Sequence, residues 1–192
     1  MSRISFATTH KILQGLHEDH INLSKISAVV AAELAVLEGG THPDYELLED
    51  VMSYVTGYPD TYHHPTEDIV FARLRLVAPE AGRDIDALLA EHDELIACGR
   101  EFLETIRAIE EEAVVARVDF LAKGRGYIDL LTAHMNREEA GLFRLAAERL
   151  DVLDWEEISA RVEAIEDPLF GPAVNADYRR LWQRITAHHP IR

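Results

Sequence analysis

Histidine and glutamate recur at helical spacing in two places along the chain. In the first place His63 is followed four residues later by Glu67, and in the second His134 is followed by Glu138. Residues four apart lie on one face of a helix, so each pair would present an imidazole and a carboxylate side by side. One such pair is usually a surface interaction that stabilises a helix by roughly 0.2–0.5 kcal/mol. The two pairs become informative only together with two further histidines.

His20 and His92 interrupt apolar stripes at positions where leucine is expected. The distance from each of them to the next His-x-x-x-Glu pair is nearly the same, 43 and 42 residues. The chain is therefore interpreted as two helical hairpins, each of which provides one histidine and then His-x-x-x-Glu. If the two hairpins lie antiparallel, the six side chains come to one level of the core.

Four long helices are predicted to position these residues. Apolar residues recur at helical spacing, and no alternation with a period of two lasts long enough to indicate a strand. We expect helices over about 9–38, 43–77, 84–109 and 114–150, with Thr8 or Thr9 as the first N-cap and Gly39-Gly40 as the first stop. Short connections between four long helices predict an all-α fold, an antiparallel up-down-up-down four-helix bundle with a C-terminal helical extension.

The extension is expected to begin after the fourth helix. Residues 1–150 would form the bundle, and residues 151–192 would pack on it without a flexible linker. Within DWEEI, Asp154 is expected to cap a short helix, with Glu157 three residues further on. The stretch DPLFG, residues 167–171, predicts a rigid turn, and a last helix is expected over 175–188.

Composition limits the class of protein and its partners. The chain has 192 residues, of which 47% are hydrophobic and 28% charged, so it is globular and long enough to bury a core. A formal charge of −16 argues against nucleic acid or an anionic membrane as a partner. Cys98 is the only cysteine, the N-terminus lacks the apolar stretch of a signal peptide, and the run ISAVVAAELAVL is too short to span a bilayer. We expect a cytoplasmic protein with no membrane partner.

The four histidines and two glutamates predict a metal site. Buried together without a compensating partner they would cost many kcal/mol, and metal ions supply the missing positive charge. Carboxylates placed between opposed histidines can bridge two ions. The set contains no thiolate, which excludes a sulfur-rich zinc site, and it favours iron, with manganese or zinc as substitutes. The alternative is a helical module that holds no metal.

These residues resemble those of the hemerythrin-like (HHE cation-binding) proteins. The matching motifs are LHEDH with His20, YHHPTED with His63 and Glu67, EHDEL with His92, and HMNREE with His134 and Glu138. YPD before the second motif, and DWEEI and DPLFG after the last, resemble a bacterial subfamily, so the likeness covers nearly the whole chain. The resemblance implies a non-haem di-iron centre bridged by Glu67 and Glu138. One iron would take His20 and His63, and the other His92 and His134.

The chain departs from the oxygen-carrying members of that family at one position. They have a second histidine four residues after the one on the third helix, where this chain has Ile96. His64 is the candidate for the seventh ligand. Pro65 disfavours α-helical geometry at His64, and Pro59 adds a second disturbance, so a kink would turn His64 toward the metals. The alternative is that His64 only supports other ligands or lies on the surface.

Other polar residues near the six are interpreted as supporting or packing groups. His17 lies one turn before His20, where it either supports the site or packs between helices. Asp68 and Glu139 are expected to be solvated or to neighbour the bridging glutamates. Tyr127 could bond a ligand or an oxygen species, but core packing is the favoured interpretation.

The function predicted from these residues is binding or sensing of O₂, a related small oxidant such as peroxide or nitric oxide, or iron itself. The competing hypothesis is a di-iron oxidoreductase that consumes peroxide or nitric oxide. The sequence contains neither an obvious electron entry route nor a dedicated signalling domain, and binding is therefore favoured. Catalytic turnover of peroxide, as against stoichiometric oxidation, would separate the two.

Overall fold

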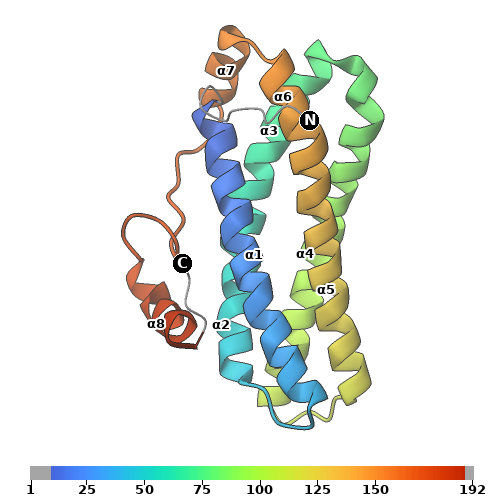
Figure 1. Ribbon diagram of the computed structural model, residues 1–192, viewed down its shortest axis with the longest axis vertical. Coiled ribbons are helices and arrows are strands. Elements are labelled where there is room, and N and C mark those ends of the chain that lie inside the picture. Colours follow the sequence, from blue (N-terminus) through green and yellow to red (C-terminus); the bar gives the residue numbers. More distant parts are fainter. Residues whose placement is uncertain (1–9, 189–192) are drawn as a thin grey trace.

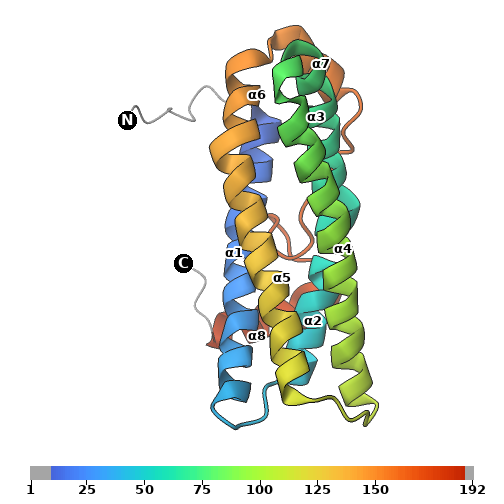
Figure 2. The same ribbon diagram turned by 90° about the vertical axis from the view of Figure 1, so that its right-hand side faces the viewer.

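The computed structural model of the chain describes residues 10–188, and every regular element within them is a helix. The all-α class is therefore confirmed. Four long helical segments lie side by side, as the two views in Figures 1 and 2 show. The first and second segments join at the lower end of Figure 1, as do the third and fourth, whereas the second and third join at the upper end. All four segments thereby share one elongated core.

The first segment is α1 (Lys11–Glu38). It begins two residues later than predicted, and its N-cap is His10, whose Nδ1 accepts a hydrogen bond from the Ile12 amide at 3.3 Å. The predicted caps Thr8 and Thr9 lie outside the described residues. The predicted stop is confirmed, because the helix ends before Gly39 and Gly40 adopts a φ of 86°, a left-handed conformation that favours glycine.

The second segment is broken, so the prediction of one continuous helix over 43–77 is wrong. It consists of α2 (Tyr45–Val55), the π-helical η2 (Pro59–His63) and α3 (His64–Val77). Asp44 caps α2 by accepting a hydrogen bond from the Leu47 amide at 3.0 Å. The first and last residues of the segment agree with the prediction, but its helical pitch changes over η2, which ends at His63.

The third and fourth segments follow short connections. After η3 (Pro79–Ala81), α4 (Gly82–Glu110) is a single uninterrupted helix, as expected. The fourth segment was predicted as one helix over about 114–150, but it is interrupted: it contains α5 (Arg117–Arg137), a second π-helical stretch η4 (Glu138–Leu142), and α6 (Phe143–Arg149). Single π turns inside α-helices are frequent at functional sites. Each π turn here contains one residue of a His-x-x-x-Glu pair: η2 ends at His63, and η4 begins at Glu138.

Two buried apolar clusters fill the core on either side of the histidines. One cluster contains Tyr54, Phe102 and Phe120, and the other contains Phe71 and Phe143. Along α1, α4 and the α5–α6 segment, the histidine or His-Glu pair falls between residues of the two clusters. The polar residues are therefore closed off at both ends by packed side chains.

The residues after the bundle form α7 (Val152–Ser159), η5 (Ala176–Tyr178) and α8 (Arg179–His188). The expected cap of the short helix is corrected: Asp151 is its N-cap. Asp154 is the third helical residue, and its carboxylate accepts from the Asp151 amide at 2.8 Å while Asp151 accepts from the Asp154 amide at 3.0 Å. This reciprocal pair is a capping box.

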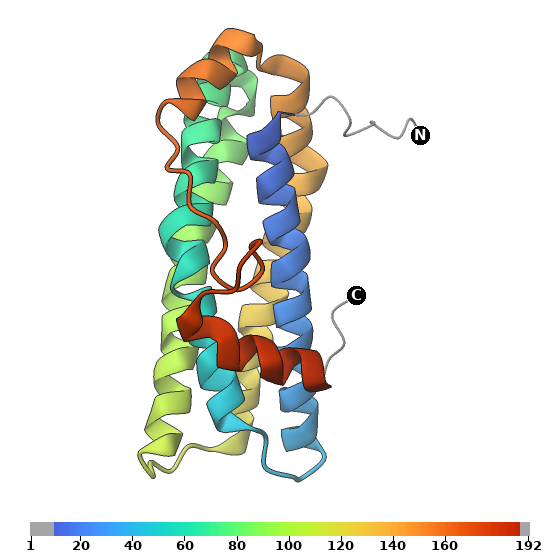
Figure 3. The ribbon, with the colours of Figure 1, turned by 90° about the vertical axis from the view of Figure 1, so that its left-hand side faces the viewer.

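The DPLFG turn fastens the C-terminal extension to the bundle. One oxygen of Asp167 accepts hydrogen bonds from the Leu169 and Phe170 amides, at 2.8 and 2.9 Å. Its other oxygen accepts from the hydroxyl of Tyr54 on α2 at 2.9 Å. Figure 3 shows α8 lying across the bundle. Leu181 and Ile185 of α8 are buried in the same cluster as Tyr54. The division at residue 150 stays a prediction.

Among the described residues, only α1 is long and apolar enough to cross a membrane by length and composition. Its buried residues, which include Leu23, Val30 and Leu34, pack against the other helices of the bundle. A core helix of a bundle passes the same length and composition test. The expected absence of a membrane partner stays a prediction.

Candidate metal centre

The structure brings all seven predicted ligands together in the middle of the bundle. Glu67 and Glu138 are 0% exposed, and none of the five histidines is more than 5% exposed. Two groups have ligand atoms close enough to hold an ion: His20, His63 and Glu67 form one group, and His64, Glu67, His92 and His134 form the other. Glu67 belongs to both groups. Whether the seven residues act as ligands stays a prediction.

Glu67 directs one oxygen to each group. Its Oε1 lies 3.3 Å from Nε2 of both His20 and His63. Its Oε2 lies 3.3 Å from Nε2 of His92. A carboxylate whose two oxygens face different sets of imidazoles has the arrangement of a bridging ligand.

Glu138 also contacts histidines of both groups. Its Oε2 lies 3.3 Å from Nε2 of His20 and 3.1 Å from Nε2 of His134. Its Oε1 lies 3.4 Å from Nε2 of His92. Both glutamates therefore lie between opposed histidines, as the repeat in the sequence requires.

Several buried polar atoms at this centre have no hydrogen-bond partner among the described residues. They are Nε2 of His20, Nε2 of His134, both oxygens of Glu67, Oε2 of Glu138 and Nδ1 of His64. Unsatisfied buried polar atoms cost free energy, and native proteins rarely cluster them. Most of these atoms face the shared centre, and nitrogen and carboxylate oxygen are ligands of iron, manganese and zinc. The donor set therefore fits metal ions.

The electrostatics of the site show that its buried carboxylates need positive charge nearby. Burial lowers the pKa of His20, but the adjacent carboxylates of Glu138, Glu139 and Glu67 outweigh it and raise this pKa to about 11. Burial would raise the pKa of Glu67, but neighbouring histidines hold it well below its usual range. The buried carboxylates are thus ionised and require positive charge nearby, which either protons or metal ions can supply.

Each of the four histidines from the repeat donates Nδ1–H to an outer carboxylate, at 2.9 to 3.0 Å. The pairs are His20 with Glu139, His63 with Asp19, His92 with Asp68, and His134 with Glu91. Such bonds fix the ring so that Nε2 is free to bind a metal, and metal-binding histidines almost always have them. The outer carboxylates therefore complete the arrangement expected of metal ligands.

These pairings follow the internal repeat. The acid immediately before the first histidine of a hairpin (Asp19, Glu91) bonds to the second histidine of the same hairpin. The acid immediately after the glutamate (Asp68, Glu139) bonds to the first histidine of the other hairpin. Sequence reasoning treated Asp68 and Glu139 as solvated or as neighbours of the glutamates, and it missed Asp19 and Glu91. The available signal was an acid before the first histidine and another after the glutamate in both halves of the repeat.

His64 lies inside the centre, but the predicted cause is wrong. Its backbone is α-helical, with φ −57° and ψ −44°, although Pro65 follows it. The change of direction comes from η2, which ends at His63 and carries the wider π turn immediately before His64. The His64 ring stacks on His92 with centroids 4.5 Å apart. Burial and the nearby His63 keep the pKa of His64 well below 6.5, so the ring is neutral, the form that binds metals.

The remaining predicted neighbours have defined positions. His17, whose side chain is 37% exposed, lies 2.8 Å from the same Glu139 oxygen that His20 contacts, so it supports the outer shell of the centre. Tyr127 is buried and packs over Gly99, where an added Cβ would meet its ring at 3.2 Å. Packing, the favoured interpretation of Tyr127, agrees with this position.

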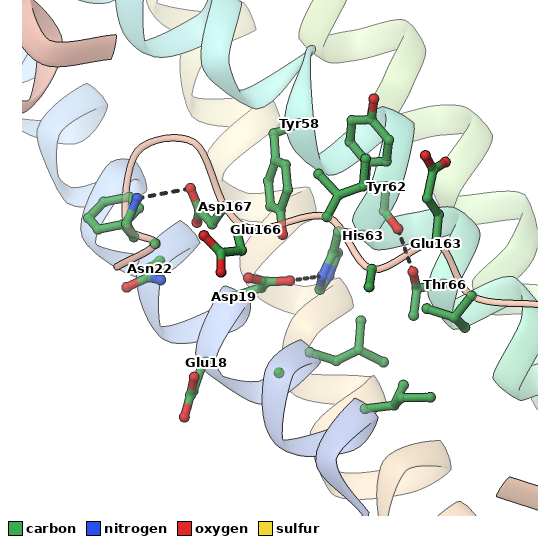
Figure 4. Close-up of a pocket in the computed structure, with 18 of the residues that line it drawn as sticks. Glu18, Asp19, Asn22, Tyr58, Tyr62, His63, Thr66, Glu163, Glu166 and Asp167 are labelled. Carbon is green, nitrogen blue, oxygen red and sulfur yellow. Dashed lines mark hydrogen bonds and ion pairs between the residues drawn. The ribbon is translucent and has the colours of Figure 1, made fainter. Parts of the chain in front are cut away.

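A cavity of about 630 Å³ opens beside one of the histidines (Figure 4). It lies between α1, η2 and residues 162–172 of the extension. Its lining includes Asp19, hydrogen-bonded to His63, together with Tyr58, Tyr62 and Glu166. The cavity therefore brings solvent to the outer side of the His20 and His63 group.

Comparison with known proteins identifies one family. The family model described as the hemerythrin HHE cation binding domain matches residues 11–146, which include all seven candidate ligands and end before the extension. No curated protein and no solved structure matches the chain.

Proposed function

The chain belongs to the hemerythrin HHE cation-binding domain family, and we propose that it is a non-haem di-iron protein that binds or senses O₂ or a related small oxidant, such as peroxide or nitric oxide. In this proposal Glu67 and Glu138 bridge two ions. His20 and His63 hold one ion, and His64, His92 and His134 hold the other.

The observation that carries the proposal is the position of Glu67. Its two oxygens each lie 3.3 Å from imidazoles of a different group, and the side chain is completely buried. A site for a single ion would leave one of these oxygens, and the histidines beside it, without a partner. Two ions satisfy both groups with the same carboxylate.

Iron in this site would supply redox chemistry and an open coordination position for a small oxidant. The chain itself supplies the enclosure, because apolar clusters close the core above and below the histidines. The donors are unequal: three imidazoles lie on one side, and only His20 and His63 on the other. The side with fewer donors adjoins the cavity of Figure 4, which supports entry of a small ligand there.

The setting proposed for this function follows from the sequence and the arrangement of the helices. We propose an antiparallel up-down-up-down bundle, supported by loops that join successive segments at alternate ends (Figure 1). We also propose a cytoplasmic protein without a nucleic-acid partner, supported by the single cysteine and the net charge of −16.

Metal analysis with optical spectroscopy tests the proposal. Protein purified without chelator, or loaded anaerobically with Fe²⁺, should contain two irons per chain, and its absorption spectrum should change on exposure to O₂. One equivalent of oxidant should be consumed if the protein binds or senses. Sustained peroxide turnover would favour the oxidoreductase alternative. Protein that retains no metal after Fe²⁺ loading would refute both functions.

A further inference from the structure

We propose that Asp60 is a positioning residue that holds His64 in the orientation and tautomer in which it binds a metal ion. The inference rests on the proposed function of this centre and adds a residue to it. Asp60 lies in η2, one turn before His64, and is the aspartate of the YPD motif, to which the sequence assigned no role.

The four histidines of the repeat set the precedent. Each donates Nδ1–H to a carboxylate within 3.0 Å, which leaves Nε2 directed at the glutamates. His64 is the fifth histidine of the centre, and a carboxylate stands at the corresponding place. Oδ1 of Asp60 lies 3.6 Å from Nδ1 of His64, which is too long for a hydrogen bond.

Both side chains of this contact are buried, and each has one polar atom without a hydrogen-bond partner among the described residues. The Asp60 side chain is 8% exposed and that of His64 is 6% exposed. Oδ2 of Asp60 and Nδ1 of His64 have no hydrogen-bond partner among the described residues. An ionised carboxylate in such a place is costly unless another group compensates it. A donated Nδ1–H bond from His64 would satisfy Nδ1 and give the buried Asp60 carboxylate a donor.

The repeat places apolar residues at the positions of this polar pair in the other hairpin. In the other hairpin Leu131 stands at the place of Asp60 and Met135 at the place of His64, counted from the His-x-x-x-Glu pair. Both of these apolar residues are buried in the core. The polar pair occurs only in the first hairpin, which is the one that supplies an additional histidine to the centre. This coincidence indicates a role at the centre instead of a role in packing.

A hydrogen bond from Nδ1–H to Asp60 has two consequences for metal binding. It fixes the tautomer of His64 with the lone pair on Nε2, and it prevents rotation of the ring away from His92, on which it stacks. Partners of this kind are typically worth about 10- to 100-fold in metal affinity.

The test uses Zn²⁺, which is diamagnetic, and two variants of the full chain. Asp60→Leu installs the residue of the other hairpin, and Asp60→Asn keeps an acceptor oxygen without the charge. Zn²⁺ affinity is measured by competition with a chromophoric chelator, and the tautomer of His64 by ¹⁵N NMR of histidine-labelled protein. Asp93→Asn, an exposed site beside His92 with the same change of charge, is the control.

We expect Asp60→Leu to lower the affinity for the Zn²⁺ ion that His64 binds by about 10- to 100-fold, and Asp60→Asn to lower it less. The ¹⁵N signals of His64 should lose the pattern of a protonated Nδ1 and a metal-bound Nε2. The melting temperature of metal-free Asp60→Leu should be no lower than that of wild type, because a buried carboxylate is replaced by an apolar side chain. In a His64→Ala background, Asp60→Leu should have no further effect on affinity.

Unchanged Zn²⁺ affinity and unchanged His64 signals in Asp60→Leu would overturn the assignment. An equal loss of affinity in the His64→Ala background would overturn it as well, because Asp60 would then act without His64. If the wild-type protein binds only one Zn²⁺ per chain, the two-ion site is refuted. The Asp60 proposal is still tested in that case, by the affinity of the ion that His64 binds. If the wild-type protein binds no Zn²⁺ in this assay, both proposals are refuted.

Discussion

Glu67→Gln should remove most of the stability that the protein gains from metal binding. The side chain is 0% exposed, and its two oxygens face different histidine groups, so the change affects both proposed ions at once. At a free metal concentration 100 times the dissociation constant, each ion stabilises the fold by about 2.7 kcal/mol, so two independent ions contribute about 5 kcal/mol. For a chain of this size, about 1 kcal/mol shifts the melting temperature by roughly 2–4 °C. The shift lost should therefore be roughly 10–20 °C.

Differential scanning calorimetry with and without Zn²⁺ measures this shift directly. Each variant is compared with its own metal-free form, so the effect of the substitution on the apo fold cancels. His63→Ala, which belongs to one group only, should lose about half the metal-induced shift, and Glu104→Gln, an exposed acid on α4, should lose none. If Glu67→Gln retains two ions and the wild-type shift, Glu67 does not bridge.

Three further predictions follow from the same contacts. The pKa of His20, about 11 when folded against 6.5 for a free imidazole, means that the metal-free fold binds extra protons between these values. Its stability should therefore fall as pH rises from about 7 to about 9, while the metal-loaded protein falls less, as paired thermal melts will show. Tyr54→Phe removes the hydrogen bond to buried Asp167 and should lower the free energy of unfolding, measured with denaturant, by about 1–3 kcal/mol. Amide exchange in α8 should become faster. Unchanged exchange would contradict the anchoring role of this hydrogen bond. Pro65→Ala restores a backbone amide that favours a regular α-helix over the π turn, so His64 should turn away from the centre. Zn²⁺ titration should then show one ion bound more weakly. Two ions bound with wild-type affinities would mean that Pro65 does not maintain the turn.

The sequence by itself determined the helical class and the six residues of the repeat. Both rest on periodicity: apolar residues at helical spacing predict the helices, and His-x-x-x-Glu places its two side chains on one face. The nearly equal separations of 43 and 42 residues then bring His20 and His92 to the level of the two pairs. Because the rise per residue is constant in a regular helix, the number of residues between two positions gives their separation along the bundle. The sequence separations were therefore enough to predict these positions.

Only the tertiary structure decided the rest of the centre. Asp19 adjoins His20 in the chain but bonds to His63, and Asp68 adjoins Glu67 but bonds to His92, because these contacts cross between helices. Local spacing contains no information on which faces meet. His64 points inward because η2 changes the pitch of the helix before it, and the apolar periodicity of this segment predicted a regular helix instead of a π turn. The hydrogen-bond partners of the candidate ligands are therefore known only from the packed bundle, whereas six of the seven candidate ligands were predicted from the repeat.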